Sequence, residues 1–100
     1  MPQYHHDIYE IMITKGVAPA TTHALKMYVE EGVPTGSFLE ALLSNQLMQT
    51  FSRADMWNSI LIKDIVNVVY NYVPEDAHGS PENYRQWVKQ KGLNFVKEIE

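Results

Sequence analysis

The chain has 100 residues and a formal net charge of −4; 45% of its residues are hydrophobic and 20% are charged. This length favours one domain, and the composition is typical of a globular, soluble protein rather than a disordered one. The acidic balance argues against a partner such as duplex nucleic acid, which calls for a basic face. The absence of cysteine excludes disulfides and thiol chemistry.

Two segments are candidates for a targeting or membrane segment, and neither has the expected pattern. The first ten residues, MPQYHHDIYE, lack the basic and then apolar order of a signal peptide. The most apolar run, residues 60–73, is interrupted by Lys63, Asp64, Asn67 and Asn71, so we do not expect it to span a membrane. The expected location is the cytoplasm.

Two helices are predicted in the first third of the chain. Residues 1–16 are predicted to form an N-terminal helix or docking arm, because apolar residues recur at helical spacing from Ile8 onward and Gly16 supplies a stop. Residues 19–31 are predicted as the second helix, since a proline suits its first turn and Gly32 stands where a helix ends.

The middle of the chain predicts two longer helices. The first runs from Ser37 to about Arg53, because leucines and then Phe51 recur at steps of three and four residues. The next begins after Asp55, a favourable N-cap, and ends before Pro74. Its apolar residues cover most of its circumference, which is typical of a helix at the centre of a fold.

The last predicted helix has a well-marked start. Ser80 is a suitable N-cap, Pro81 fits the first helical position, and Gly92 is the expected stop. Residues 93–100 are then a C-terminal tail. The sequence therefore predicts a single all-α domain over residues 1–100, built as a compact bundle of four to five helices. Because such a domain buries only a thin core, we expect it to assemble as a homo-oligomer.

The sequence predicts no catalytic, cofactor or metal site. It holds no nucleophile elbow, and no serine stands in a pattern that places a base beside it. His6 and Glu10 have the spacing of a ligand pair on a helix, but no metal-binding motif accompanies them. We therefore expect a protein that is not an enzyme.

Two helix starts are candidates for binding an anion through free backbone amides. The first is Thr35, Gly36 and Ser37, and the second is Gly79 and Ser80. Amides at a helix N-terminus attract negative charge, and Gly36 would let a ligand approach the backbone. The alternative is that both segments are only helix caps.

A second candidate set consists of polar residues in or near otherwise apolar helices: Asn45, Arg53, Asp55, Asn58 and Asn71. Asn45 and Arg53 are eight residues apart and are expected on one side of their helix. They could form a pocket where Arg53 meets a phosphate and amide side chains read a base or ribose. Alternatively, they form a structural network in which Arg53 pairs with Asp55 or Glu40.

Aromatic residues are numerous, and most should be in the core. The three that are least needed there are Tyr4, Tyr9 and Trp57. We regard them as candidates for interface or stacking contacts, since aromatic side chains are enriched at such surfaces.

Much of the chain after residue 31 resembles a family of small bacteriophage and prophage proteins. The shared pattern runs G-x-P-x-G-x-F-L-x-A-x-L-x-N-x-L, then R-A-D, N, I-V-x-x-x-Y-N-x-x-P, G-S-P-E and W. It is carried here by Gly32, Pro34, Gly36, Phe38, Leu39, Ala41, Leu43, Asn45, Leu47, Arg53, Ala54, Asp55, Asn58, Ile65, Val66, Tyr70, Asn71, Pro74, Gly79, Ser80, Pro81, Glu82 and Trp87. The sequence departs from the pattern at Ala77-His78, where relatives often carry Cys or Trp. The resemblance implies a phage origin and brings no catalytic residue with it.

These features together predict a phage protein that counters host defence by binding, in the cytoplasm of the host bacterium. The favoured hypothesis is a homo-oligomer that sequesters a nucleotide-derived immune signalling molecule. One alternative is an inhibitor that binds a host defence protein, such as a nuclease or a CRISPR effector, directly. Another is a structural or regulatory phage protein without a ligand.

Overall fold

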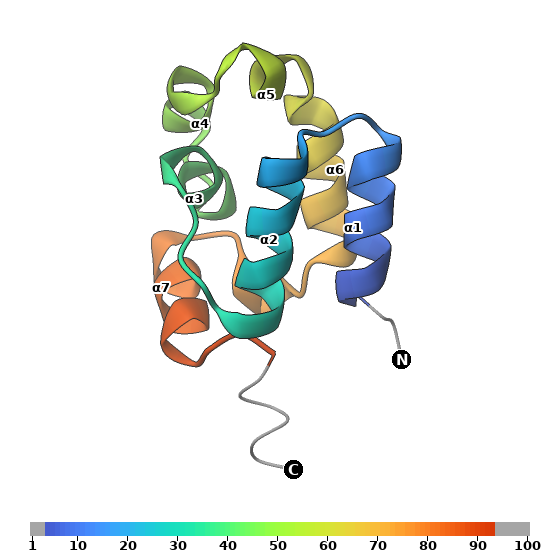
Figure 1. The fold of residues 1–100 in the computed structure, drawn as a ribbon. Coiled ribbons are helices and arrows are strands. Elements are labelled where there is room, and N and C mark those ends of the chain that lie inside the picture. Colours follow the sequence, from blue (N-terminus) through green and yellow to red (C-terminus); the bar gives the residue numbers. More distant parts are fainter. Residues whose placement is uncertain (1–3, 94–100) are drawn as a thin grey trace.

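The computed structural model describes residues 4–93, with side chains from residue 8 onward. Within this range the chain forms seven α-helices, one short 3₁₀ helix and no strand, which confirms the predicted all-α class. The elements are α1 (Tyr4–Thr14), α2 (Pro19–Glu31), α3 (Ser37–Leu43), α4 (Leu47–Arg53), α5 (Met56–Ile60), α6 (Ile62–Tyr72), η1 (Glu75–Ala77) and α7 (Pro81–Lys89) (Figure 1). Apart from Leu93, the expected C-terminal tail lies outside the described residues.

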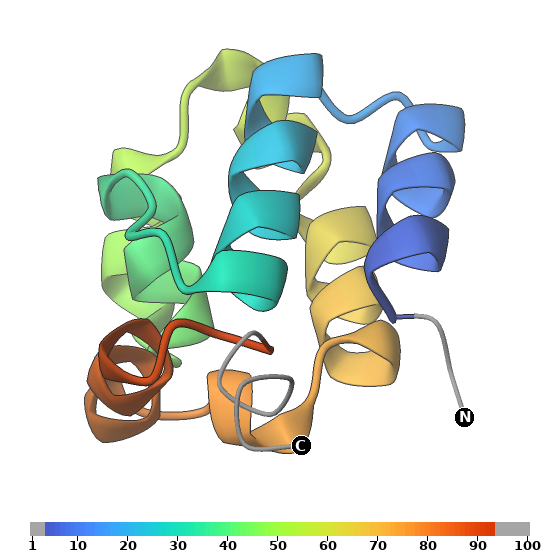
Figure 2. The ribbon, with the colours of Figure 1, turned by 60° about the horizontal axis from the view of Figure 1, so that its bottom comes forward.

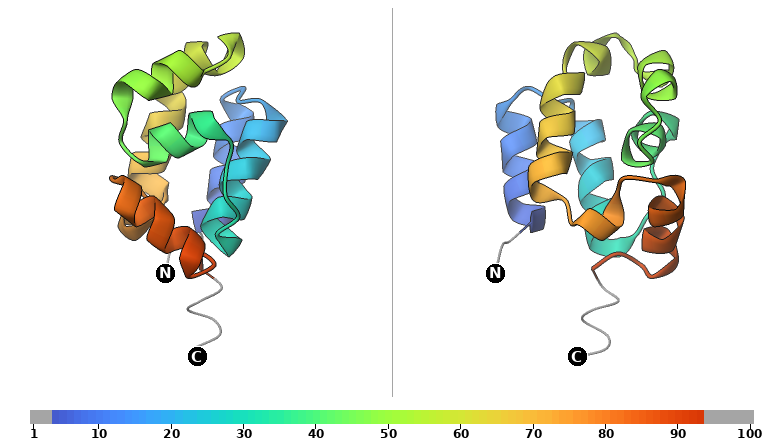
Figure 3. Two further views of the ribbon diagram at one scale, coloured as in Figure 1. Left: turned by 90° about the vertical axis from the view of Figure 1, so that its left-hand side faces the viewer. Right: turned by 180° about the vertical axis from the view of Figure 1, so that it is seen from behind.

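The helices form two groups around a shared core. In the first group α1 packs against both α2 and α6. In the second, α3 packs against α4 and α7, and α7 also contacts η1. Seen from behind, α6 stands between α1 on one side and the α3–α4 pair on the other (right panel of Figure 3).

The core draws on every helix except α4 and α5. Its fully buried side chains include Ile8 and Met12 of α1, Leu25 and Tyr28 of α2, Leu43 of α3, and Ile65 of α6. The inner faces of α2 and α7 contribute Tyr28, Val29, Tyr84 and Trp87, which are all buried. By contrast, the one buried residue in α4 is Thr50, and the one in α5 is Asn58.

The predicted signals of the first two helices are confirmed. α1 ends before Gly16, where φ is +89°, and the Val17 N–H donates to Met12 O at 2.9 Å. α2 has the predicted bounds, and its C-cap Gly32 is left-handed at φ +68°. These positive φ values explain the glycines, because other residues adopt them only at a cost. The stop of the last helix is one residue earlier than Gly92, because α7 ends at Lys89 and Lys91, with φ +65°, takes the left-handed position.

The single helix predicted from Ser37 to Arg53 is wrong, because the chain turns at Asn45. Asn45 has φ +63°, its N–H donates to Leu42 O at 3.1 Å, and the Gln46 N–H donates to Ala41 O at 2.9 Å. This is the hydrogen-bond pattern of a Schellman stop, with asparagine in the left-handed position that glycine usually takes. The segment is therefore two helices, α3 and α4.

The single helix predicted after Asp55 is also divided. It breaks at Leu61, whose φ of −103° and ψ of 10° leave the α region, so α5 and α6 are separate. No glycine or proline marks this point in the sequence. The two breaks account for the difference between the four to five helices predicted and the seven observed in the described residues.

A cluster of Tyr28, Tyr84 and Trp87 ties α2 to α7. The two tyrosine rings stack with centroids 5.0 Å apart and planes inclined by 14°. Tyr28 Oη donates to Ala77 O at 2.7 Å, and Trp87 Nε1 donates to Tyr28 O at 2.9 Å. Burial raises the pKa of Tyr28, with a further contribution from Tyr84. The Tyr28 hydroxyl and the Trp87 indole N–H therefore both have hydrogen-bond partners within the chain.

The ends of α2 and α7 meet backbone to backbone beside this cluster, and Figure 2 shows the chain after α7 running back to the C-terminal end of α2. A Cβ on Gly32 would lie 2.7 Å from Gly92 N, and a Cβ on Gly92 would lie 2.6 Å from Gly32 N. The Leu93 N–H also donates to Val29 O at 3.1 Å. Only glycine allows this approach at both positions.

Candidate functional site

Four of the predicted binding residues surround one polar hollow of about 300 Å³. Gly36 and Ser37 come from the start of α3, Arg53 from the end of α4, and Asn58 from α5. The fourth wall is the first half of α2, where Thr21 lies between Ala20 and Ala24. Figure 1 shows these segments facing one another across the upper part of the molecule. The structure thus brings together residues from four separate elements.

Arg53 is the cation of this hollow. Its side chain is exposed, and none of the ion pairs in the described part of the chain involves it. The alternative predicted from the sequence, a buried ion pair with Asp55 or Glu40, is therefore wrong. A cation in the last turn of a helix also interacts favourably with the helix dipole, which supplies a structural reason for the residue.

Asp55 and Asn58 are held by local hydrogen bonds. The Asp55 carboxylate accepts the Asn58 N–H at 2.7 Å, which confirms Asp55 as an N-cap. Asn58 is buried, and its Oδ1 accepts the Thr21 hydroxyl at 3.3 Å. The Asp55 carboxylate is thereby committed to the cap, whereas the Asn58 side chain links α5 to α2 at the edge of the hollow.

The predicted row of free amides at the two helix starts is largely wrong. The Thr35 N–H donates to Tyr84 Oη at 2.8 Å, and the Gly79 N–H donates to Leu43 O at 2.8 Å. Ser80 is a cap, as its Oγ accepts the Asn83 N–H at 3.1 Å. These contacts anchor the loops before α3 and α7, and of the predicted amide positions only Gly36 and Ser37 line the polar hollow.

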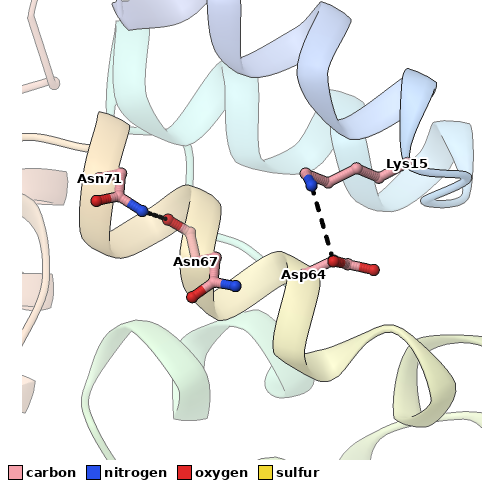
Figure 4. Close-up of polar contacts among 4 residues, drawn as sticks. All are labelled: Lys15, Asp64, Asn67 and Asn71. Carbon is pink, nitrogen blue, oxygen red and sulfur yellow. Dashed lines mark hydrogen bonds and ion pairs between the residues drawn. The ribbon is translucent and has the colours of Figure 1, made fainter.

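Asn45 and Asn71 lie away from Arg53, so the predicted set does not form one pocket. Asn45 lies in the turn before α4, whereas Arg53 is the last residue of that helix, and Asn45 borders a different hollow. Asn71 is exposed, and its Nδ2 donates to Asn67 O of its own helix at 2.8 Å (Figure 4). Nearby, Lys15 of α1 and Asp64 of α6 form an exposed ion pair at 3.8 Å, a kind that contributes little to stability.

The aromatic candidates differ in their surroundings. Trp57 is 57% exposed, as expected for a residue not needed in the core, and its Nε1 donates to Gly16 O at 2.9 Å. Tyr9 is half-buried on α1. The side chain of Tyr4 lies outside the described part of the chain.

A second hollow, the α4–α6 groove, lies between those two helices and the loop before α7. Its volume is about 230 Å³, and its walls include Leu47, Phe51, Val66 and Tyr70. Asn45, Gly79 and His78 line it as well. The sequence pattern predicted Leu47, Phe51 and Val66 as part of apolar faces, yet they are 67%, 53% and 42% exposed. The groove shares no lining residue with the polar hollow.

Sequence reasoning missed two features of these surfaces. Thr21 was not predicted as a site residue, although the small residues around it on α2 allow other segments to approach. His78 was not predicted as a site residue either, yet its Nε2 is buried and has no hydrogen-bond partner among the described residues. Within those residues there is also no group of three or more acidic or histidine side chains that could hold a metal ion.

Comparison with protein-family models, curated proteins and solved structures gives no match to this chain. The resemblance to small phage proteins therefore stays a prediction. Among the described residues, none of the helices has the length and apolar character needed to cross a bilayer.

Proposed function

We propose that this chain is a non-enzymatic phage protein that counters host defence by sequestering a nucleotide-derived signalling molecule. The observation that supports this function best is the polar hollow, where an arginine without an acidic partner among the described residues stands beside hydroxyl and amide side chains. We propose further that the working form is a homo-oligomer in the cytoplasm of the host.

The chemistry of the hollow fits a small molecule that carries phosphate. The Arg53 guanidinium is a planar fork of donors that suits a phosphate group. Ser37 offers a hydroxyl, and the Asn58 side chain, whose Oδ1 already accepts the Thr21 hydroxyl, offers its amide N–H donors to a base or a ribose. The apolar side chains of Ala20 and Ala24 on α2 and of Phe38 on α3 also line the hollow and give a base a surface to lie on.

The size of the hollow favours a site that an assembly enlarges. Ligand pockets have volumes of roughly 300–1,000 Å³, so about 300 Å³ is at the lower end of that range. A neighbouring chain that covers part of the opening would enclose more of the ligand and exclude water from the phosphate contact. This is why the proposed function includes self-association.

A thermal-shift experiment on the whole chain tests the proposal. The panel comprises cyclic mononucleotides, cyclic dinucleotides and ADP-ribose-type compounds. A ligand that binds only the folded chain at a hundred times its Kd stabilises it by about 2.7 kcal/mol. We expect at least one member to raise Tm, and Arg53→Ala to abolish that rise.

The matched control is Arg85→Ala, since Arg85 is an exposed arginine of α7 that pairs with Glu82 at 3.7 Å, away from the hollow. It should leave the ligand-induced shift unchanged. The proposal fails if no panel member shifts Tm and heating the protein after incubation with an extract of infected cells releases no nucleotide. A host polypeptide that co-purifies at a fixed ratio would favour direct inhibition of a defence protein instead.

A further inference from the structure

We infer that the α4–α6 face is the surface on which a second copy of this chain docks. The α4–α6 face consists of the groove residues Leu47, Phe51, Val66 and Tyr70 together with Met48. This face shares no lining residue with the polar hollow, so the inference goes beyond the proposed function and rests on burial and charge rather than on the ligand.

In α4 a polar side chain is buried and the large apolar side chains are exposed. Its one buried residue is Thr50, whereas Leu47, Met48 and Phe51 are 67%, 81% and 53% exposed. Thr50 is satisfied within its own helix, as its hydroxyl donates to Gln46 O at 2.7 Å. A helix that buries its threonine and exposes its large apolar side chains lacks a covering partner on that side.

The same holds for the outer side of α6. Ile65, Val68 and Val69 are buried by the chain itself, but Val66 and Tyr70 are 42% and 79% exposed. Both exposed residues line the groove, opposite Leu47 and Phe51 of α4. A single chain thus buries only some of the apolar side chains that the spacing predicts to be buried in α4 and α6, and it leaves those on the groove side exposed.

The absence of charged residues on the face favours a second copy of the chain as its occupant. Residues 41–52 and 65–74 include the whole of the face and contain no Asp, Glu, Lys or Arg, although the chain has a net charge of −4. Two identical acidic chains repel one another wherever their charged surfaces meet, and this neutral face lets them approach without placing like charges opposite one another. A basic partner would find no carboxylate here to bind.

Composition and shape agree with this occupant. Methionine and aromatic residues are enriched, and charged residues depleted, in the cores of protein interfaces. A two-fold pair brings the same patch of both copies together, so a self-complementary patch needs both a hollow and a projection. The groove supplies the hollow, and Met48 and Tyr70, the most exposed side chains of the face, supply the projections.

The available area is also of the right order. The five side chains are 42–81% exposed and an aromatic side chain alone can bury roughly 150–250 Å², so covering them removes on the order of 500 Å² of apolar surface per copy. A standard interface buries about 800 Å² per partner, polar rim included. The exposed amides of Asn67 and Asn71 on α6 stand beside the face and can form that rim.

Sedimentation of the whole chain over a range of concentrations tests the inference. We expect the mass to rise toward that of two chains, and Val66→Lys or Leu47→Lys to weaken association at least about a hundredfold, because each buries a charge without a partner. The matched control is Val33→Lys, since Val33 is 43% exposed, close to the 42% of Val66, but does not line the groove. Circular dichroism checks that each variant is helical; if one groove variant fails to fold, the other is used.

The result that supports the inference is a dimer that persists in Val33→Lys and dissociates in the groove variants. It is overturned if the wild-type chain is monomeric at every concentration, or if Val33→Lys weakens association as much as the groove variants. The ligand proposal can fail independently, since Arg53 lies outside the face. A chain that dimerises but binds no nucleotide would support this interface and overturn the proposed function.

Discussion

The tyrosine–tryptophan cluster and the α4–α6 face are built in opposite ways. In the cluster, Tyr28, Tyr84 and Trp87 are buried, stacked or hydrogen-bonded to backbone atoms far away in the sequence. On the face, large apolar side chains of similar size are exposed, and the side-chain hydrogen bond of Thr50 stays within one turn of its own helix. The first region is complete within one chain, whereas the second has the composition of a core without the burial.

This difference predicts that the cluster determines the stability of the single chain and that the face determines association. Substitutions in the cluster should lower the stability of the single chain, because contacts there are already made in it. Substitutions on the face should leave the single chain nearly as stable and act on association. The following experiments test this division, in order of decreasing effect.

The largest loss is expected for Gly92→Ala, at the point where α7 meets α2. The added Cβ would lie 2.6 Å from Gly32 N and 2.7 Å from Val29 O, and φ at this position is +64°. Strain and overpacking together should lower the free energy of unfolding by about 3 kcal/mol or more. Urea denaturation measures this loss.

Gly16→Ala is the control for that substitution. Gly16 also has a positive φ, +89°, but nothing lies within 4 Å of an added Cβ. It should lose only the backbone term, about 1–2 kcal/mol. Equal losses at the two glycines would show that the close approach of α2 and α7 contributes nothing.

The two tryptophans provide a matched pair across the two kinds of environment. Each donates from Nε1 to a backbone oxygen at 2.9 Å, but Trp87 is 4% exposed and Trp57 is 57% exposed. Trp87→Phe removes a buried donor from Tyr28 O, which keeps its hydrogen bond from the Gly32 N–H, and it leaves a small void, so it should cost about 2 kcal/mol. Trp57→Phe should cost about 0.5 kcal/mol, since water replaces the lost donor. Similar costs in denaturant unfolding would contradict the division.

An effect that appears only at alkaline pH is expected from the ionisation of Tyr28. Burial raises its pKa above the ordinary value of 10.0, so the folded chain holds this proton more tightly than the unfolded chain does. Its contribution to stability is complete below pH 10 and is lost as the pH rises further, by about 1.4 kcal/mol per pH unit. Unfolding in urea from neutral to alkaline pH should show this decline, and Tyr28→Phe should make it shallower. An equal decline in both chains would assign it to other groups.

The smallest effect on the single chain is expected for Met48→Gln. Met48 is 81% exposed, so the free energy of unfolding at low protein concentration should change by no more than about 0.5 kcal/mol. Met12 on α1 is fully buried, and Met12→Gln should destabilise the chain strongly, because it buries an amide in the core. A large loss for Met48→Gln at low concentration would mean that a single chain already covers the face.

Local signals in the sequence predicted the ends of the fold better than its middle. Pro19 with Gly32, and Ser80 with Pro81, fix helix ends through backbone conformation and capping, which depend on nearby residues only. The turn at Asn45 was missed because asparagine is a weaker stop signal than glycine, and the apolar spacing continued across it. The break at Leu61 was missed because no glycine or proline marks it and the apolar spacing continues across it.

The candidate site was only partly predictable for the same reason. Polar residues beside apolar helices pointed to Arg53 and Asn58, and these do share a hollow. Their separation from Asn45 depends on the direction of α4 after the turn, and the use of the Thr35 amide depends on Tyr84, which is 49 residues away. Apolar periodicity indicates that Leu47 and Phe51 should be buried, but it does not say whether their own chain or a second copy buries them.

Hydrogen exchange at two protein concentrations tests the central claim most directly, because it measures both regions in one sample. If a second copy completes the α4–α6 face, exchange in α4 should slow markedly at the higher concentration, while exchange in α7 stays the same. Exchange in α4 that is equal at both concentrations, or a uniform slowing over the whole chain, would contradict the account.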